Sequence, residues 1–235
     1  MIGGLENILT MLIVILATLA ALAGIVVLES FFRNKLKELF SDVNYFIFFF
    51  LIIGYLLYSI GEVSFYLARF ILKEASSIGI SDVYWSGGAI FILISFIMLA
   101  FILFKHNYNH AKFVTMMIIG GALLGFVLYL LFGVTLGKEA HFFNYFYPII
   151  SSLIVTFALS VVLFSSDLEH FGTALLFFFL ASCGILLGDI FFTYTITKGV
   201  YGLAGLIADV SYLLGYGLSF VAFITLRLRM RTLAI

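Results

Sequence analysis

Long apolar runs, separated by short polar segments, make up most of this chain of 235 residues. Each run is long enough to cross a bilayer, since about 20 predominantly apolar residues span the hydrocarbon core as a helix. The first run lacks the basic segment of a cleavable signal peptide, because residues 1–10 carry only the acidic Glu6. We therefore predict seven transmembrane helices, at about residues 8–31, 43–70, 84–104, 113–134, 148–165, 172–195 and 203–226.

The composition supports a membrane protein without a soluble domain. Hydrophobic residues make up 64% of the chain and charged residues 10%, whereas ordinary globular domains have about 25% charged residues. The fold class is therefore an all-α integral membrane bundle that forms one domain over residues 1–235. The formal net charge of zero argues against a nucleic-acid partner. The single cysteine, Cys183, excludes an intramolecular disulfide and is interpreted as a packing residue.

Lysine and arginine in the loops predict the orientation of the bundle. Eight of these twelve residues fall on the side that carries the C-terminus, namely Arg33, Lys35, Lys37, Lys105, Lys112, Arg227, Arg229 and Arg231. The other side carries Arg69, Lys73, Lys138 and Lys198. Basic loops stay in the cytoplasm, so we expect a multi-pass protein of the plasma membrane with the N-terminus outside and the C-terminus inside.

Two carboxylates stand out in the segment 188–217, which forms the last two predicted helices. Asp189 and Asp209 each lie within an apolar run. An acid at the centre of a membrane helix costs roughly 2.5–3.5 kcal/mol on insertion scales, and such a residue is therefore a candidate for function. Tyr212 and Tyr216 follow Asp209 by three and seven residues and so share its helix face.

An earlier helix carries a similar group around Glu62. Tyr58 precedes Glu62 by four residues and Arg69 follows it by seven, so both side chains can lean toward this carboxylate. We predict an outward-facing polar pocket between the second, third, sixth and seventh helices, which binds a small ligand or cation. Its predicted lining residues are Glu62, Asp189, Asp209, Tyr212, Tyr216, Tyr58 and Arg69.

A purely structural interpretation of the same residues stays open. Asp82 and Asp209 lie near helix N-termini, where a carboxylate can accept bonds from free N–H groups. Glu62 and Arg69 can form a structural ion pair. Aromatic residues near the outer helix ends are interpreted as interface anchors, and the only proline, Pro148, is placed at the first turn of the fifth helix. The anchor candidates are Tyr84, Trp85, Tyr145, Tyr147, Tyr194 and Tyr201.

A shift of 127 residues aligns the second and third helices with the sixth and seventh. Glu62 then falls on Asp189 and Asp82 on Asp209, with the same spacing of 20 residues within each pair. Apolar sequences reach such similarity by chance as well as by duplication. If the duplication is real, residues 8–104 and 146–226 are parallel repeats joined by a linker helix at 113–134, a 3+1+3 plan found in transporters.

Small residues recur with the four-residue spacing that lets helices approach closely. The pairs are Gly121 with Gly125 and Gly184 with Gly188. They indicate either a homo-oligomer interface or packing within the chain, and packing within the chain is the favoured interpretation.

Several classes of chemistry find no support. The seventh helix has no lysine for a retinal Schiff base, so no cofactor is expected. His106 and His110 fall in a short polar loop without a thiol or acid beside them, which argues against a metal site. The sequence contains no catalytic triad pattern, phosphate-binding glycine loop or CxxC motif, so we expect no enzymatic activity and no catalytic residues.

The last two predicted helices resemble those of the seven-helix membrane domains attached to prokaryotic sensor histidine kinases and diguanylate cyclases. The matching positions are Gly188-Asp189, Tyr194, Gly199-Val200-Tyr201, Asp209, Tyr212 and Gly215-Tyr216. The resemblance implies a membrane domain that senses a ligand and signals to an output domain. This chain ends about nine residues after the last predicted helix, so such a sensor would need a separate cytoplasmic or membrane partner protein.

Three functions follow from these observations. The first is a sensor-like receptor for a small ligand or cation. The second is a transporter of the 3+1+3 layout for a small solute or for a cation or proton, although the proline hinges of known sugar transporters of that plan are absent. The third is a structural subunit of a membrane complex. Uptake into proteoliposomes favours the second, and co-purification with a signalling protein favours the first.

Overall fold

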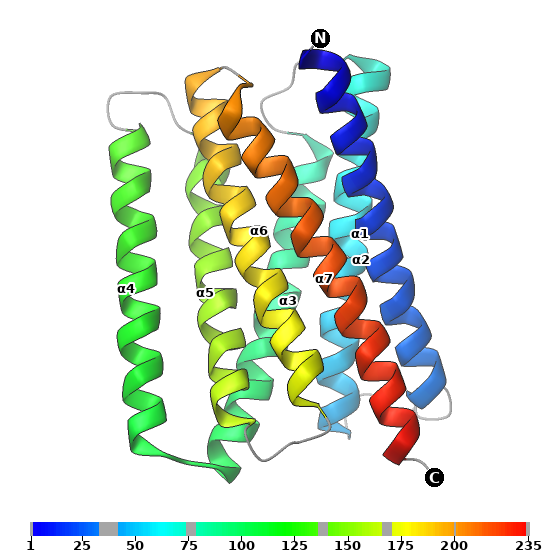
Figure 1. The fold of residues 1–235 in the computed structure, drawn as a ribbon, viewed down its shortest axis with the longest axis vertical. Coiled ribbons are helices and arrows are strands. Elements are labelled where there is room, and N and C mark those ends of the chain that lie inside the picture. Colours follow the sequence, from blue (N-terminus) through cyan, green and yellow to red (C-terminus); the bar gives the residue numbers. More distant parts are fainter. Residues whose placement is uncertain are drawn as a thin grey trace.

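The computed structural model describes residues 2–32, 42–73, 79–135, 141–165, 171–199 and 201–233. These residues form seven long helices and no strand (Figure 1). The helices are α1 (Ile2–Phe32), α2 (Val43–Tyr66) with its π-helical continuation η2 (Leu67–Leu72), α3 (Ile80–His106), α4 (His110–Thr135), α5 (Phe142–Phe164), α6 (Gly172–Lys198) and α7 (Leu203–Leu233).

All seven helices are long and apolar enough to cross a membrane. The predicted all-α bundle is therefore confirmed, and the chain is a multi-pass membrane protein. We define the N-terminal face as the end at which α1, α3, α5 and α7 begin, and the C-terminal face as the opposite end. The assignment of the N-terminal face to the outside stays a prediction. Four of the basic residues behind it, Arg33, Lys35, Lys37 and Lys138, lie outside the described residues.

The sequence had suggested that Pro148 lies in the first turn of α5, but it occupies the seventh position of that helix. Proline has no N–H, so the carbonyl of Asn144, four residues earlier, loses its helical partner. The Thr193 hydroxyl of α6 donates to that Asn144 oxygen at 3.3 Å. In a membrane the freed backbone group must find such a partner inside the protein. A side chain on a neighbouring helix therefore lets α5 start six residues before the predicted position.

Six of the helices form a closed ring, and α4 lies outside it. Around the ring α1 packs on α2, α2 on α3, α3 on α5, α5 on α6, α6 on α7, and α7 on α1. The remaining helix, α4, packs mainly on α5 at the edge of the bundle (Figure 1). If each helix is moved three places around this ring, α1, α2 and α3 take the places of α5, α6 and α7. Helices that are neighbours then remain neighbours.

Glycines bring the helices of each hairpin close together. A Cβ on Gly88 of α3 would lie 2.8 Å from the Gly54 carbonyl oxygen of α2, and one on Gly184 of α6 would lie 3.0 Å from Cα of Gly215 in α7. Gly184 and Gly188 thus pack within the chain, as expected. For Gly121 and Gly125 of α4 the expected intramolecular packing is wrong, because nothing lies within 4 Å of a Cβ added at either position.

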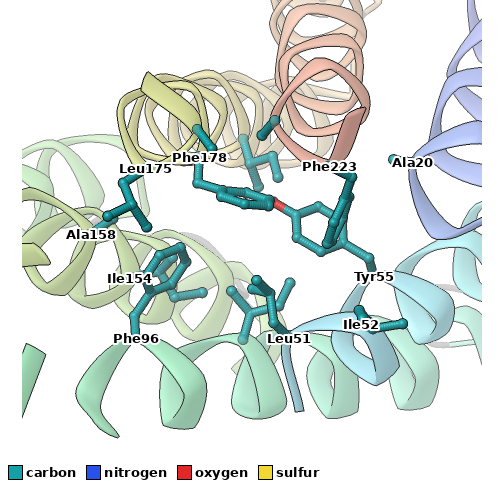
Figure 2. Packing of buried hydrophobic residues seen from close by; sticks show 14 of the residues in the cluster. Ala20, Leu51, Ile52, Tyr55, Phe96, Ile154, Ala158, Leu175, Phe178 and Phe223 are labelled. Carbon is teal, nitrogen blue, oxygen red and sulfur yellow. The ribbon is translucent and has the colours of Figure 1, made fainter. Parts of the chain in front are cut away.

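Aromatic rings fill the centre of the bundle toward the C-terminal face. The ring of Phe178 lies 4.9 Å from that of Phe223 and 6.4 Å from that of Phe96, measured between centroids. Tyr55 packs edge-on against Phe223, and its hydroxyl accepts a bond from Ser219 at 2.8 Å. Figure 2 shows these rings pointing toward one another from α2, α3, α6 and α7. The C-terminal half of the ring is therefore closed.

The bond between Thr193 and Asn144 gives a test of this packing. We expect Thr193→Val to lower the free energy of unfolding by about 0.5–1.5 kcal/mol, since a membrane-buried carbonyl loses its donor. In a Pro148→Ala background the restored N–H can donate to Asn144, so the same substitution should cost almost nothing. Equilibrium unfolding of the four proteins in detergent measures both costs, and equal costs in the two backgrounds would contradict the assignment.

Candidate functional site

A pocket opens inside the ring toward the N-terminal face. It has a narrow inner part of about 50 Å³ and a wider outer cavity of about 320 Å³, and the two share several lining residues. We call them the inner pocket and the outer cavity. The inner pocket is lined by Glu62, Asp189 and Asp209, by four tyrosines, and by aromatic and aliphatic side chains from α1, α2, α3, α5, α6 and α7.

Glu62 lies near the end of the α-helical part of α2 and is 7% exposed. The Tyr216 hydroxyl of α7 donates to its Oε1 atom at 2.7 Å. The buried Nε1 of Trp85 lies beside the same carboxylate and has no hydrogen-bond partner among the described residues. Glu62 and Tyr216, two predicted site residues 154 positions apart, therefore meet in the pocket.

Asp189 is buried more deeply than the sequence suggested. It is 8% exposed and lies nine residues before the end of α6, which corresponds to about 13 Å along the helix. The Tyr212 hydroxyl donates to Oδ1 at 2.8 Å, and the Ser151 hydroxyl donates to Oδ2 at 2.5 Å. Both oxygens of this carboxylate are therefore held by hydroxyl groups from α5 and α7.

Asp209 lies between the inner pocket and the outer cavity and lines both. The Tyr201 hydroxyl donates to its Oδ2 atom. Tyr201 itself lies outside the predicted membrane spans, and burial, followed by this hydrogen bond, raises its pKa above the ordinary value. Asp82 instead has the capping role expected of it: its Oδ2 accepts the Gly79 N–H at 2.8 Å, and its Oδ1 accepts the Tyr147 hydroxyl at 2.9 Å.

Arg69 does not contact Glu62, so the expected structural pair between them is wrong. Its guanidinium Nη2 lies 2.5 Å from Oε1 of Glu6 in α1, and its side chain is 49% exposed. Arg69 falls within the π-helical turn Leu67–Leu72, and a π turn breaks the periodicity on which the seven-residue spacing relied. Arg69 and Glu6 line the outer cavity rather than the inner pocket.

Tyr58 faces the inner pocket without a polar partner. Its side chain is 5% exposed, and its ring packs edge-on against Tyr216 with centroids 6.3 Å apart. Its hydroxyl makes no hydrogen bond to any residue in the described part of the chain. The hydroxyl lines the inner pocket and is therefore free to form a hydrogen bond with a bound ligand.

Several residues of the site were not predicted from the sequence. Ser151 of α5 is a hydrogen-bond partner of Asp189, and Thr10 of α1 lines both parts of the pocket, but neither helix has an acid among the residues that line the inner pocket. Trp85, Tyr147 and Tyr201 were interpreted as interface anchors, but all three line the pocket or its outer cavity. An aromatic residue near a helix end is compatible with either position, and no pattern along the chain distinguishes the two.

The inner pocket carries negative groups and no positive ones. None of its lining residues, all within the described part of the chain, is lysine, arginine or histidine. The hydroxyl partners of Glu62 and Asp189 are neutral, and an unpaired charge in a low-dielectric site is costly. Protons or a bound cation must therefore neutralise these carboxylates. The described residues contain no group of three side chains suited to a metal ion.

The surroundings of Glu62 and Asp189 recur at the spacing of 127 residues. A Cβ on Gly61 would lie 2.5 Å from the Trp85 ring, and one on Gly188 would lie 2.5 Å from the Tyr212 ring. Phe65 contacts Trp85, and Phe192 contacts Tyr212, with centroids 5.4 Å and 6.4 Å apart. The two phenylalanines also contact each other at 6.2 Å. Matching positions thus make matching contacts and meet at the centre of the ring.

Comparison with known proteins finds no family model, no curated protein and no solved structure that matches this chain. The resemblance of the last two helices to sensor domains therefore rests on their residues alone, of which Val200 lies outside the described ranges.

The glycine at position 188 provides a test of the site. We expect Gly188→Ala to push the Tyr212 ring away from Asp189 and to lower the free energy of unfolding by about 1–3 kcal/mol, as overpacking does. Gly121→Ala is the matched control, because its Cβ meets nothing within 4 Å and alanine favours helix by up to about 1 kcal/mol. Unfolding in detergent measures both variants, and an unchanged stability of Gly188→Ala would contradict the tight contact.

Proposed function

We propose that this protein is a transporter that moves a small solute across the plasma membrane by alternating access. The observation that carries the proposal is the ring of six helices, in which two sets of three enclose the inner pocket. Transporters with two parallel repeats bind their substrate between the repeats and rock one against the other. The proposal assigns the protein no enzymatic activity, and it takes the N-terminal face as the outer one.

The recurring contacts support two equivalent halves, α1–α3 and α5–α7. The pairs Gly61–Trp85 and Gly188–Tyr212 have the same spacing and the same close approach. Contact between Phe65 and Phe192 is expected if an approximate two-fold axis, running along the helices, passes between them. The linker helix α4 would then serve to return the chain to the same side of the membrane, and its position outside the ring fits that role.

The bundle is open at the N-terminal face and closed at the C-terminal face, which is the arrangement expected for one state of a transport cycle. The outer cavity leads from the N-terminal face to the inner pocket, whereas aromatic packing around Phe178 and Phe223 fills the other end. Glycine contacts make each of the hairpins α2–α3 and α6–α7 a tightly packed unit. Movement between the halves would then open the aromatic end and close the outer cavity.

A sensor-like receptor is the second candidate. It is favoured by the residues of the resemblance, because Asp189 with Tyr212 and Asp209 with Tyr201 form two hydrogen-bonded pairs at the pocket. In that case a ligand would bind without being moved, and a partner protein would receive the signal. The open face of α4 at Gly121 and Gly125 is the feature that a structural subunit or a homo-oligomer would use.

Access from the C-terminal face distinguishes a transporter from a receptor. Ser182 of α6 is buried below the inner pocket, so a cysteine there is closed to both faces in this conformation. In a Cys183→Ala background, we expect a membrane-impermeant maleimide to label Ser182→Cys from the C-terminal face as the protein cycles. Thr195→Cys, in the outer cavity, should be labelled from the N-terminal face.

Ser95→Cys is the control for unfolding. Ser95 is also buried, and its hydroxyl donates to the Ile47 carbonyl within the α2–α3 hairpin at 3.0 Å. This hairpin would move as a unit, so a cysteine at position 95 should stay unlabelled in every state. If Ser182→Cys and Ser95→Cys are equally protected from the C-terminal face, the transport proposal fails and the receptor remains.

A further inference from the structure

We propose that the inner pocket binds a small organic cation, an ammonium group on an apolar body, with the charged head between Glu62 and Asp189. This inference rests on the proposed function and names the substrate class of the same pocket. Its starting point is the charge of the lining. Three carboxylates line the inner pocket and no basic side chain does, so an anion would be repelled and a neutral solute would leave the acids to be neutralised by protons alone, whereas a cation supplies the counter-charge itself.

The hydrogen bonds of the pocket leave acceptors for such a head. Within the described residues, Glu62 accepts a hydrogen bond at Oε1 from Tyr216, and its Oε2 atom accepts none. An ammonium group has three N–H donors and no acceptor. It can therefore donate to Glu62 Oε2 and share the oxygens of Asp189, which tolerate additional donors because a carboxylate has about four lone-pair sites.

The Tyr58 hydroxyl is an independent sign that a ligand completes the site. It lies in a side chain that is 5% exposed, it lines the inner pocket, and it has no hydrogen-bond partner in the described chain. Its oxygen can accept the third ammonium N–H. The Tyr58 ring is fixed by T-shaped contacts with the rings of Tyr216 and Tyr55, each with centroids 6.3 Å apart.

The shape and the aromatic lining select an organic cation over an inorganic one. The inner pocket, at about 50 Å³, is large enough for a small charged head group, and the outer cavity of about 320 Å³ leaves room for an organic body attached to it. Trp85, Tyr147 and Tyr212 present aromatic rings to the inner pocket, and such rings attract organic ammonium groups.

Trp85 provides a direct measurement of binding, because it is the only tryptophan of the chain and it lines both parts of the pocket. The full-length protein in lipid nanodiscs is titrated with phenethylamine, 2-phenylethanol and 3-phenylpropanoate, which share a body and differ in the charge of the head. Trp85 fluorescence and titration calorimetry are recorded. We expect the amine to bind at least about tenfold more tightly than either of the other two.

Three substitutions test the assigned contacts. Glu62→Gln and Asp189→Asn keep the shape of the side chain and remove its charge, so each should lower the affinity for phenethylamine at least about tenfold. Tyr58→Phe removes a hydroxyl that has no partner within the described chain. Tyr58→Phe should therefore lower the affinity for the amine about threefold to tenfold while leaving the unfolding midpoint unchanged. Glu29→Gln, an exposed acid outside the pocket, should leave binding unchanged.

The outcomes separate the substrate class from the transport proposal. Amine binding that Glu62→Gln and Asp189→Asn weaken, together with uptake of labelled phenethylamine into proteoliposomes, supports both. The same binding without uptake supports the substrate class and removes transport. Equal affinities for the three probes, tighter binding of Na⁺ or K⁺, or a Tyr58→Phe variant that binds the amine as tightly as the parent protein would overturn the organic-cation assignment.

Discussion

Two carboxylates buried among apolar helices are the constraint on which the rest of this structure depends. Glu62 and Asp189 lie in membrane-spanning helices without a cation beside them in the described chain. In place of a cation, the fold supplies hydroxyl groups as hydrogen-bond donors. Tyr216 donates to Glu62, and Tyr212 and Ser151 donate to Asp189. A hydrogen bond lowers the cost of burying an acid but leaves its charge uncompensated. The pocket is therefore kept open beside these groups rather than packed closed.

Glycine allows the hydroxyl group of Tyr212 to reach Asp189. Gly188 leaves no room for a Cβ beneath the Tyr212 ring, so Tyr212 can lie flat on α6 and direct its hydroxyl at Asp189, one residue further along. In α2 the same position is Gly61, and Trp85 covers it in the same manner. Each acid thus follows a glycine on which an aromatic ring of the next helix rests. The unit therefore needs a Gly-acid pair on one helix and an aromatic residue on the next, Trp85 for Gly61 and Tyr212 for Gly188.

The features that a single helix determines could be predicted from the sequence, and those that depend on a second helix could not. Run length determines the seven helices, and the rarity of membrane acids marks Glu62 and Asp189 as site residues. The position of Pro148 inside α5 depends on Thr193 of α6, and the partner of Arg69 depends on a π turn and on α1. No local pattern contains either fact. The aromatic residues Trp85 and Tyr147 face the pocket for the same reason, since only the ring of helices distinguishes the inward direction from the lipid.

Glu62 and Asp189 occupy matching positions at the shift of 127 residues but differ in how they link the proposed halves, α1–α3 and α5–α7. Both tyrosine donors come from α7, because the positions of α3 that correspond to Tyr212 and Tyr216 are Trp85 and Ala89. Asp189 is therefore held within its own half, whereas Glu62 is bonded to the opposite half through Tyr216. A cation placed between the acids can donate to Oε2 of Glu62 while Tyr216 keeps Oε1, so it adds a second link between the proposed halves. In the proposed cycle this asymmetry couples occupancy of the pocket to movement: the empty pocket has one polar link from Glu62 to the opposite half, and the occupied pocket has that link and the bound cation.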